Sequence, residues 1–181
     1  MKAQLTIQYL ISFIAFIGLI TYIYISYSVN IPAYIQTVKK EATRSKAYQL
    51  SELLINDPGE PVDWYQLSAD NIKRIGLSDE SLNRQNLISS KKIDKLNNIF
   101  SCSTETSYNL LRKKLGLEDK DFSIIISMIE NDGSRNLLYD CIPSITVERT
   151  INITITRIVT INDTNSVPSG VLNATEVIVQ M

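Results

Sequence analysis

Few residues in this 181-residue chain are of the types that carry enzyme chemistry. The sequence contains no histidine and two cysteines. Histidine is the usual general base near neutral pH and a common zinc ligand, so its absence excludes imidazole-based triads and histidine-ligated zinc. Two cysteines alone cannot complete a four-ligand structural zinc site. We therefore expect no metal and no cofactor.

The remaining candidates for site chemistry are a Ser-x-x-Lys match and one acidic cluster. Ser89 and Lys92 have the spacing of the serine nucleophile and lysine base of some acyl-transfer enzymes, but we interpret them as the capped start of a helix. Glu118, Asp119 and Asp121 lack the spacing and glycine of a calcium loop and are typical of a solvated turn. With six glycines and no Gly-Lys-Ser/Thr sequence, the chain has no phosphate-binding loop. These patterns predict that the protein is not an enzyme.

Two cysteines and three sequons bear instead on the compartment of the chain. Cys102 and Cys141 would form a disulfide in an oxidising compartment, closing a loop of about forty residues worth roughly 4 kcal/mol, or would stay buried thiols in a reducing one. The acceptor sequons begin at Asn152, Asn162 and Asn173, all in the final third of the chain. Their clustering favours an exported, glycosylated body.

The elements that position these residues begin with a long apolar stretch. No residue from Leu5 to Val29 is charged. As a helix this stretch would measure roughly 37 Å, enough to cross a ~30 Å hydrocarbon core with some tilt. A core helix of a soluble domain would be shorter and carry a polar stripe, and a cleaved secretory signal would have a shorter run followed by a small-x-small site. We expect a retained, single-pass anchor in the cell membrane.

The opening "MKAQLTIQYL" resembles the class III signal of archaeal type IV pilin-like proteins. In that family a short basic leader ends in a small residue and is followed by Gln-x-Ser-x-Glu and an apolar helix. Lys2 matches the base, Ala3 the small residue, Gln4 the glutamine and Thr6 the serine. The resemblance implies that a prepilin-peptidase-like protease cuts between Ala3 and Gln4, and that the helix packs beside those of other pilin-like subunits.

One position departs from the family pattern, because Gln8 stands where the family usually has glutamate. In pilin-like fibres that carboxylate is thought to pair with the new N-terminal amine of a neighbouring subunit. A neutral amide can accept a hydrogen bond but cannot neutralise a buried ammonium. The departure leaves processing in place and argues against polymerisation of this chain by itself.

The charges around the span give conflicting indications of topology. Lys39, Lys40, Arg44 and Lys46 follow the span, which by the positive-inside rule favours a cytoplasmic body. They begin about ten residues beyond the apolar run, where the rule is weak, and the sequons and cysteines point the other way. We expect the head outside the cell. The basic cluster would then contact anionic lipid headgroups or form a solvated helix face.

The sequence predicts four segments along the chain. Residues 1–3 form a short leader, 4–31 the transmembrane segment, 32–56 an amphipathic continuation of the helix, and 57–181 the head. Pro32 can kink the helix or begin a new one. The helix should stop at Asn56–Asp57, because Pro58, Gly59 and Pro61 cannot continue it.

The head has the patterns of a single α+β domain. Helical spacing predicts helices over residues 89–100 and 104–115, the second capped by Ser103 or Thr104. From Phe122 the apolar period changes to two, which predicts a hairpin turning at 131–133, a strand within 145–163 and a last strand from 171. The expected sheet has about four mostly antiparallel strands. Trp64, the only tryptophan, is expected to pack on the long helix rather than to stack on a ligand.

Two functions from different classes remain. The first is a pilin-like structural subunit, minor or accessory, of an archaeal type IV pilus or related surface or secretion system. The second is a single-span, membrane-tethered extracellular binding module that does not assemble into filaments. A net charge of −1 without a basic stripe argues against a nucleic-acid partner.

Overall fold

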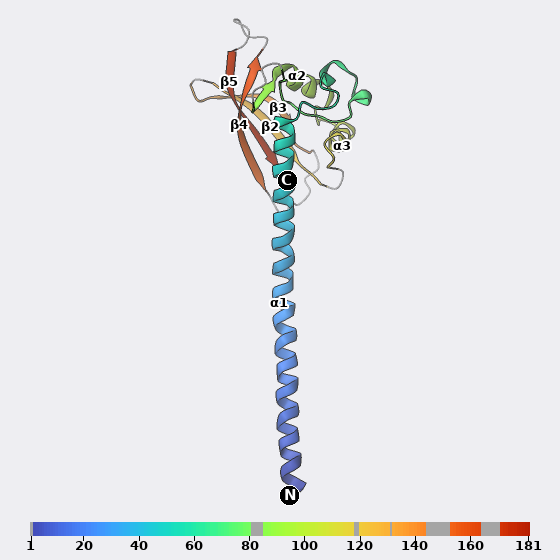
Figure 1. Cartoon of the computed structure of the whole chain (residues 1–181), viewed down its shortest axis with the longest axis vertical. Helices are drawn as coiled ribbons and strands as arrows, with labels where there is room; N and C mark the ends of the chain where they lie inside the picture. The colour runs from blue at the N-terminus through green and yellow to red at the C-terminus, as the bar shows by residue number, and fades with distance from the viewer. Residues whose placement is uncertain (1, 81–84, 118–119, 131, 144–152, 164–170) are drawn as a thin grey trace. The chain divides into compact units, whose positions relative to one another are not determined.

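The computed structural model describes residues 2–80, 85–117, 120–130, 132–143, 153–163 and 171–181 (Figure 1). The chain divides into two compact units, residues 1–42 and residues 43–181. The second unit combines short helices with a five-stranded, mostly antiparallel sheet, so the predicted α+β class is confirmed.

The first element, helix α1, runs without interruption over Lys2–Asn56. It continues through Pro32, whose missing N–H leaves the carbonyl of Ser28 without its usual helical donor. It ends at Asn56, as predicted from the Pro58-Gly59 sequence that follows. Its last turns belong to the second unit, where Ala47, Leu50 and Leu54 are buried.

The sheet has the strand order β1-β4-β5-β2-β3. Its strands are β1 (Leu87–Ser89), β2 (Ser123–Ile129), β3 (Arg135–Cys141), β4 (Thr154–Asp163) and β5 (Val171–Gln180). β1 pairs with β4 in parallel, and the other pairs are antiparallel. The sequence prediction missed β1, because three residues are too few to show a period of two.

The predicted hairpin is confirmed as β2 and β3. Gly133 supplies the positive φ of the turn, at 82°, and the amide of Ser134 donates to Asp132 Oδ1 at 2.8 Å. The second half of the strand expected within 145–163 is confirmed as β4, and residues 144–152 lie outside the described residues.

Two helices precede the hairpin, α2 (Ser90–Ile99) and α3 (Glu105–Lys114), close to their predicted ranges. Thr104 caps α3, with its hydroxyl oxygen accepting from the amide of Ser107 at 3.3 Å. Ser89 occupies the N-cap position of α2, but its side chain makes no capping bond, so the predicted serine cap is wrong in this detail.

The core lies on one face of the sheet. Ile124 and Ile126 of β2 and Val177 and Val179 of β5 are fully buried there. Helix α2 packs against β3, β4 and the short 3-10 helix η1 (Trp64–Gln66). The core therefore joins the sheet, the short helices and the end of α1 into one hydrophobic cluster.

Candidate functional site

The first unit, residues 1–42, has an unusually apolar surface. Its large apolar side chains, from Ile7 to Val38, are between 44% and 73% exposed. A helix in the core of a soluble domain would bury such residues, and monomeric soluble proteins rarely expose contiguous apolar surface of this extent. This segment therefore requires an apolar solvent or apolar partners.

The length of the segment matches a bilayer. The chain has one helix long and apolar enough to cross a membrane among the residues that the structure describes. Tyr9 and Tyr27 are both exposed and, at 1.5 Å per residue, lie about 27 Å apart along the axis. Tyrosine is enriched at the two membrane interfaces, which are ~30 Å apart. Tyr9 and Tyr27 thus have the spacing of the aromatic belts of a membrane helix, with Tyr22 and Tyr24 between them.

Several polar side chains within this segment donate hydrogen bonds to the backbone of the helix itself. The hydroxyls of Thr21 and Ser28 donate to the carbonyl four residues earlier, each at 2.8 Å. The amide of Asn30 donates in the same way to Ser26 at 2.7 Å. Because a polar group without a partner costs several kcal/mol in hydrocarbon, these bonds make the segment compatible with lipid.

The residues of the predicted processing signal lie in the first turns of α1. Lys2, Ala3, Gln4 and Thr6 are helical, and their side chains lie outside the described residues. Gln8 is exposed. Cleavage between Ala3 and Gln4 stays a prediction.

The head contains the disulfide that the sequence left open. Cys102 and Cys141 are bonded, with their Cα atoms 5.1 Å apart and a separation of 39 positions in sequence. Both are buried, so the bridge lies in the core and joins the segment before α3 to the end of β3. Beside it, the hydroxyl of Tyr139 donates to the carbonyl of Phe100 at 2.7 Å, and burial raises the pKa of Tyr139 above its usual range.

The three sequons have different environments. Asn152 lies outside the described residues. Asn173 is half-buried on β5. Asn162 on β4 is only 9% exposed, and its Nδ2 donates to Asp79 Oδ2 at 2.8 Å. Since Nδ2 is the atom that a glycan would modify, glycosylation of Asn162 would replace this hydrogen bond; glycosylation stays a prediction at all three positions.

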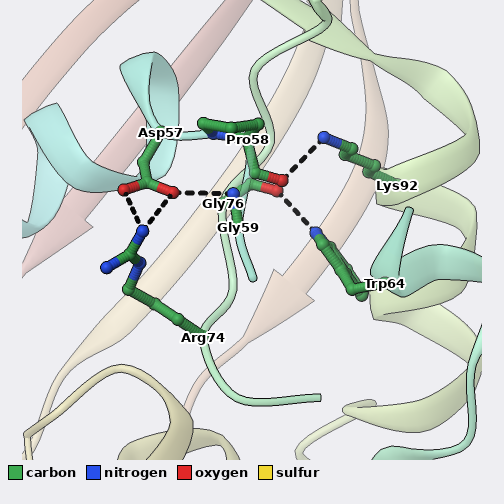
Figure 2. Close-up of polar contacts among 7 residues, drawn as sticks. All are labelled: Asp57, Pro58, Gly59, Trp64, Arg74, Gly76 and Lys92. Carbon is green, nitrogen blue, oxygen red and sulfur yellow. Dashed lines mark hydrogen bonds and ion pairs between the residues drawn. The ribbon is translucent and has the colours of Figure 1, made fainter. Parts of the chain in front are cut away.

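The Ser-x-x-Lys pair is not arranged for nucleophilic catalysis. Lys92 is 4% exposed, and its Nζ donates to the carbonyls of Pro58 and Ser78, each at 2.7 Å. Figure 2 shows the bond to Pro58. Burial lowers the pKa of Lys92 even though carboxylates, including that of Glu80, lie nearby. Both hydrogen bonds of Nζ are to backbone carbonyls, and the side chain of Ser89 is not among its partners. Lys92 thus cross-links α2 to the chain that follows α1.

Lys92 belongs to a group of contacts at the end of α1, which we call the α1 joint (Figure 2). Asp57 pairs with Arg74 at 2.9 Å and accepts from the amide of Gly59 at 2.7 Å. Trp64 is fully buried, and its indole N–H donates to the carbonyl of Gly76 at 2.9 Å. Trp64 is therefore buried in the head, and its neighbours are the segments at Gly59 and Gly76; packing on the long helix stays a prediction.

Close packing at the α1 joint leaves no room for side chains at its glycines. A Cβ on Gly76 would lie 2.1 Å from the carbonyl oxygen of Asp57. A Cβ on Gly59 would lie 2.5 Å from the ring of Trp64, and the φ of Gly59 is 87°. The sequence analysis missed this joint. The one available signal was the Pro-Gly pair after α1, which marks a turn but not its distant partners.

The acidic cluster predicted to be a solvated turn is only partly described, since Glu118 and Asp119 lie outside the described residues. In the part of the chain that the structure describes, no group of three or more His, Cys, Asp or Glu side chains could hold a metal ion. No family model, curated protein or solved structure matches the chain, so the argument for function rests on its residues and geometry.

Proposed function

We propose that this protein is a membrane-anchored, pilin-like structural subunit with an accessory role in an archaeal type IV pilus or a related surface or secretion system. The observation that carries the proposal is the exposed apolar surface of residues 7–38, attached to a head that has its own core. Such a helix is stable in a bilayer, and the same surface can pack against the apolar helices of other subunits.

The disulfide supports an exported head. A bridge between Cys102 and Cys141 persists in an oxidising environment and is rare in a reducing cytosol. The head then faces the outside of the cell, and the first turn of α1 faces the cytoplasm. That orientation exposes Ala3 and Gln4 to a membrane protease on the cytoplasmic side.

The accessory role follows from Gln8. After cleavage, the new amine of Gln4 would lie among apolar helices in a filament, where an unpaired charge costs several kcal/mol. Gln8 can accept a hydrogen bond from that amine but supplies no negative charge. We infer that the protein enters filaments beside partners that carry the carboxylate.

The N-terminus of the mature protein tests the proposal directly. Intact-mass and N-terminal peptide analysis of protein from native membranes should show a chain that begins at Gln4. Ala3→Leu should block this processing because the peptidase reads a small residue before the cut, whereas Ala3→Gly should leave it unchanged. A wild-type chain that keeps Met1 or Lys2, or an Ala3→Leu variant with the mature mass, would refute the class III interpretation.

The second candidate is a membrane-tethered binding module, and one observation favours it: the head has a groove with a polar, buried floor, described below. A retained N-terminus, together with the absence of pilin-like subunits in cross-linked complexes, would favour this function over the first.

A further inference from the structure

The head carries a groove whose floor is built from buried polar side chains. We call it the Lys92 groove; its volume is about 330 Å³, and it lies wholly within residues 43–181. Lys92 and Asn162 form its floor, at 4% and 9% exposed. Buried polar groups are usually hydrogen-bonded. Any hydrogen-bonding capacity that these two side chains do not use within the protein therefore indicates what kind of ligand the groove can hold.

The floor retains one hydrogen-bond donor that none of the described residues accepts. A lysine ammonium has three donors, and Lys92 gives two of them to the carbonyls of Pro58 and Ser78. No described residue accepts the third. Asn162 directs one donor to Asp79, and its amide has further donor and acceptor capacity. The floor can therefore both donate to a ligand and accept from it.

The charges on the walls exclude a strongly charged ligand. Asp63, Asp79 and Glu80 line the groove together with Lys91 and Lys92, three carboxylates against two ammonium groups. The carboxylates disfavour a phosphate or other anion, while the ammonium groups disfavour a bare cation. A purely apolar ligand would leave the polar floor unpaired. A neutral ligand rich in hydroxyl groups matches this lining, because each hydroxyl can donate to a carboxylate and accept from an ammonium.

One wall provides an apolar surface for such a ligand. Tyr65 and Val62 line the groove, and Tyr65 also packs against the core, which fixes its position. The faces of aromatic rings carry partial negative charge and attract the weakly positive C–H groups of a sugar ring. We propose that the Lys92 groove is a binding site for a neutral saccharide, with Tyr65 against the ring and Glu80, Asp79, Lys92 and Asn162 bonding its hydroxyls.

The inference is independent of filament assembly, since every residue of the groove lies in the head. A larger recess lined by Glu52 and Arg157 borders residues 81–84, which lie outside the described residues, and the Lys92 groove does not include it. In the Lys92 groove a monosaccharide can make a few hydrogen bonds and one ring contact. This predicts dissociation constants of about 1 mM.

Saturation-transfer NMR on the full chain tests the proposal, in a detergent without a sugar headgroup. The probes are the methyl glycosides of glucose, mannose, galactose and N-acetylglucosamine, with glucuronate and glucosamine as charged counterparts. At least one neutral glycoside should bind near 1 mM and more tightly than its charged counterpart. Tyr65→Ala or Glu80→Gln should weaken that binding at least fivefold.

Matched variants outside the groove provide the control. Tyr34→Ala on α1 and Glu130→Gln after β2 should bind the same glycoside as wild type does. The proposal is overturned if no neutral glycoside shows transfer at 20-fold the expected dissociation constant, if only charged sugars bind, or if neither groove variant weakens binding.

Discussion

Removal of the disulfide should lower the free energy of unfolding of the head by about 4 kcal/mol. The bridge joins residues 39 apart, so the loop-entropy relation gives about 13 cal/mol/K, or roughly 4 kcal/mol at 25 °C. The comparison is between wild type and the double variant Cys102→Ala/Cys141→Ala. Both sulfur atoms are buried, and the lost packing adds to the entropic effect.

Trp64 fluorescence reports this transition, because it is the only tryptophan and is fully buried in the head. With a urea dependence of roughly 2 kcal/mol per molar, the unfolding midpoint should fall by about 2 M. A reductant should shift wild-type protein by a similar amount and leave the double variant unchanged. That control separates the bridge from any effect of the alanines.

A shift below about 1 kcal/mol, or an equal effect of reductant on both proteins, would refute the assignment of the stability to the bridge.

Thiol labelling in cells tests the compartment. If the head is exported, both cysteines in freshly unfolded protein should react only after reduction. Labelling without reductant would instead indicate a cytoplasmic head.

Three further predictions concern single residues. Gly76→Ala should destabilise the head by about 2 kcal/mol or more, because the new Cβ would meet the backbone of Asp57. As a control, Gly18→Ala should leave urea unfolding of the head unchanged, because a Cβ there has no atom within 4 Å. Lys92→Met should lower the free energy of unfolding of the head by about 2 kcal/mol at neutral pH. Burial lowers the pKa of Lys92 in the folded state, so between that pKa and 10.5 the unfolded state binds more protons than the folded state does. The free energy of unfolding of wild type, measured from urea curves at several pH values, should therefore rise with pH in this window. The same pH slope in Lys92→Met would contradict this. When expressed without other pilin-like proteins, wild type should stay in the membrane, and Gln8→Glu should form filaments more readily. Electron microscopy and sedimentation measure this difference, and abundant wild-type filaments would contradict the accessory role.

The sequence by itself determined the elements that have a local cause. An uncharged run of Ile, Leu, Phe and Tyr specifies an apolar helix wherever it lies, and Pro58-Gly59 stops that helix at Asn56. The hairpin of β2 and β3 follows from a period of two around an Asp-Gly turn. Each of these patterns is complete within a few turns or strand residues, so no distant contact is needed to read it.

Only the tertiary structure decided which distant residues meet. Lys92 bonds a carbonyl 34 residues earlier, and Asn162 bonds a carboxylate 83 residues earlier. Neither pair has a spacing that differs from chance, and each residue alone is typical of a solvated surface. The pairing arises because the parallel strand β1 brings Ser89 level with Asn162, which places the start of α2 beside the end of β4. The Lys92 groove is a consequence of that topology, and no local pattern encodes it.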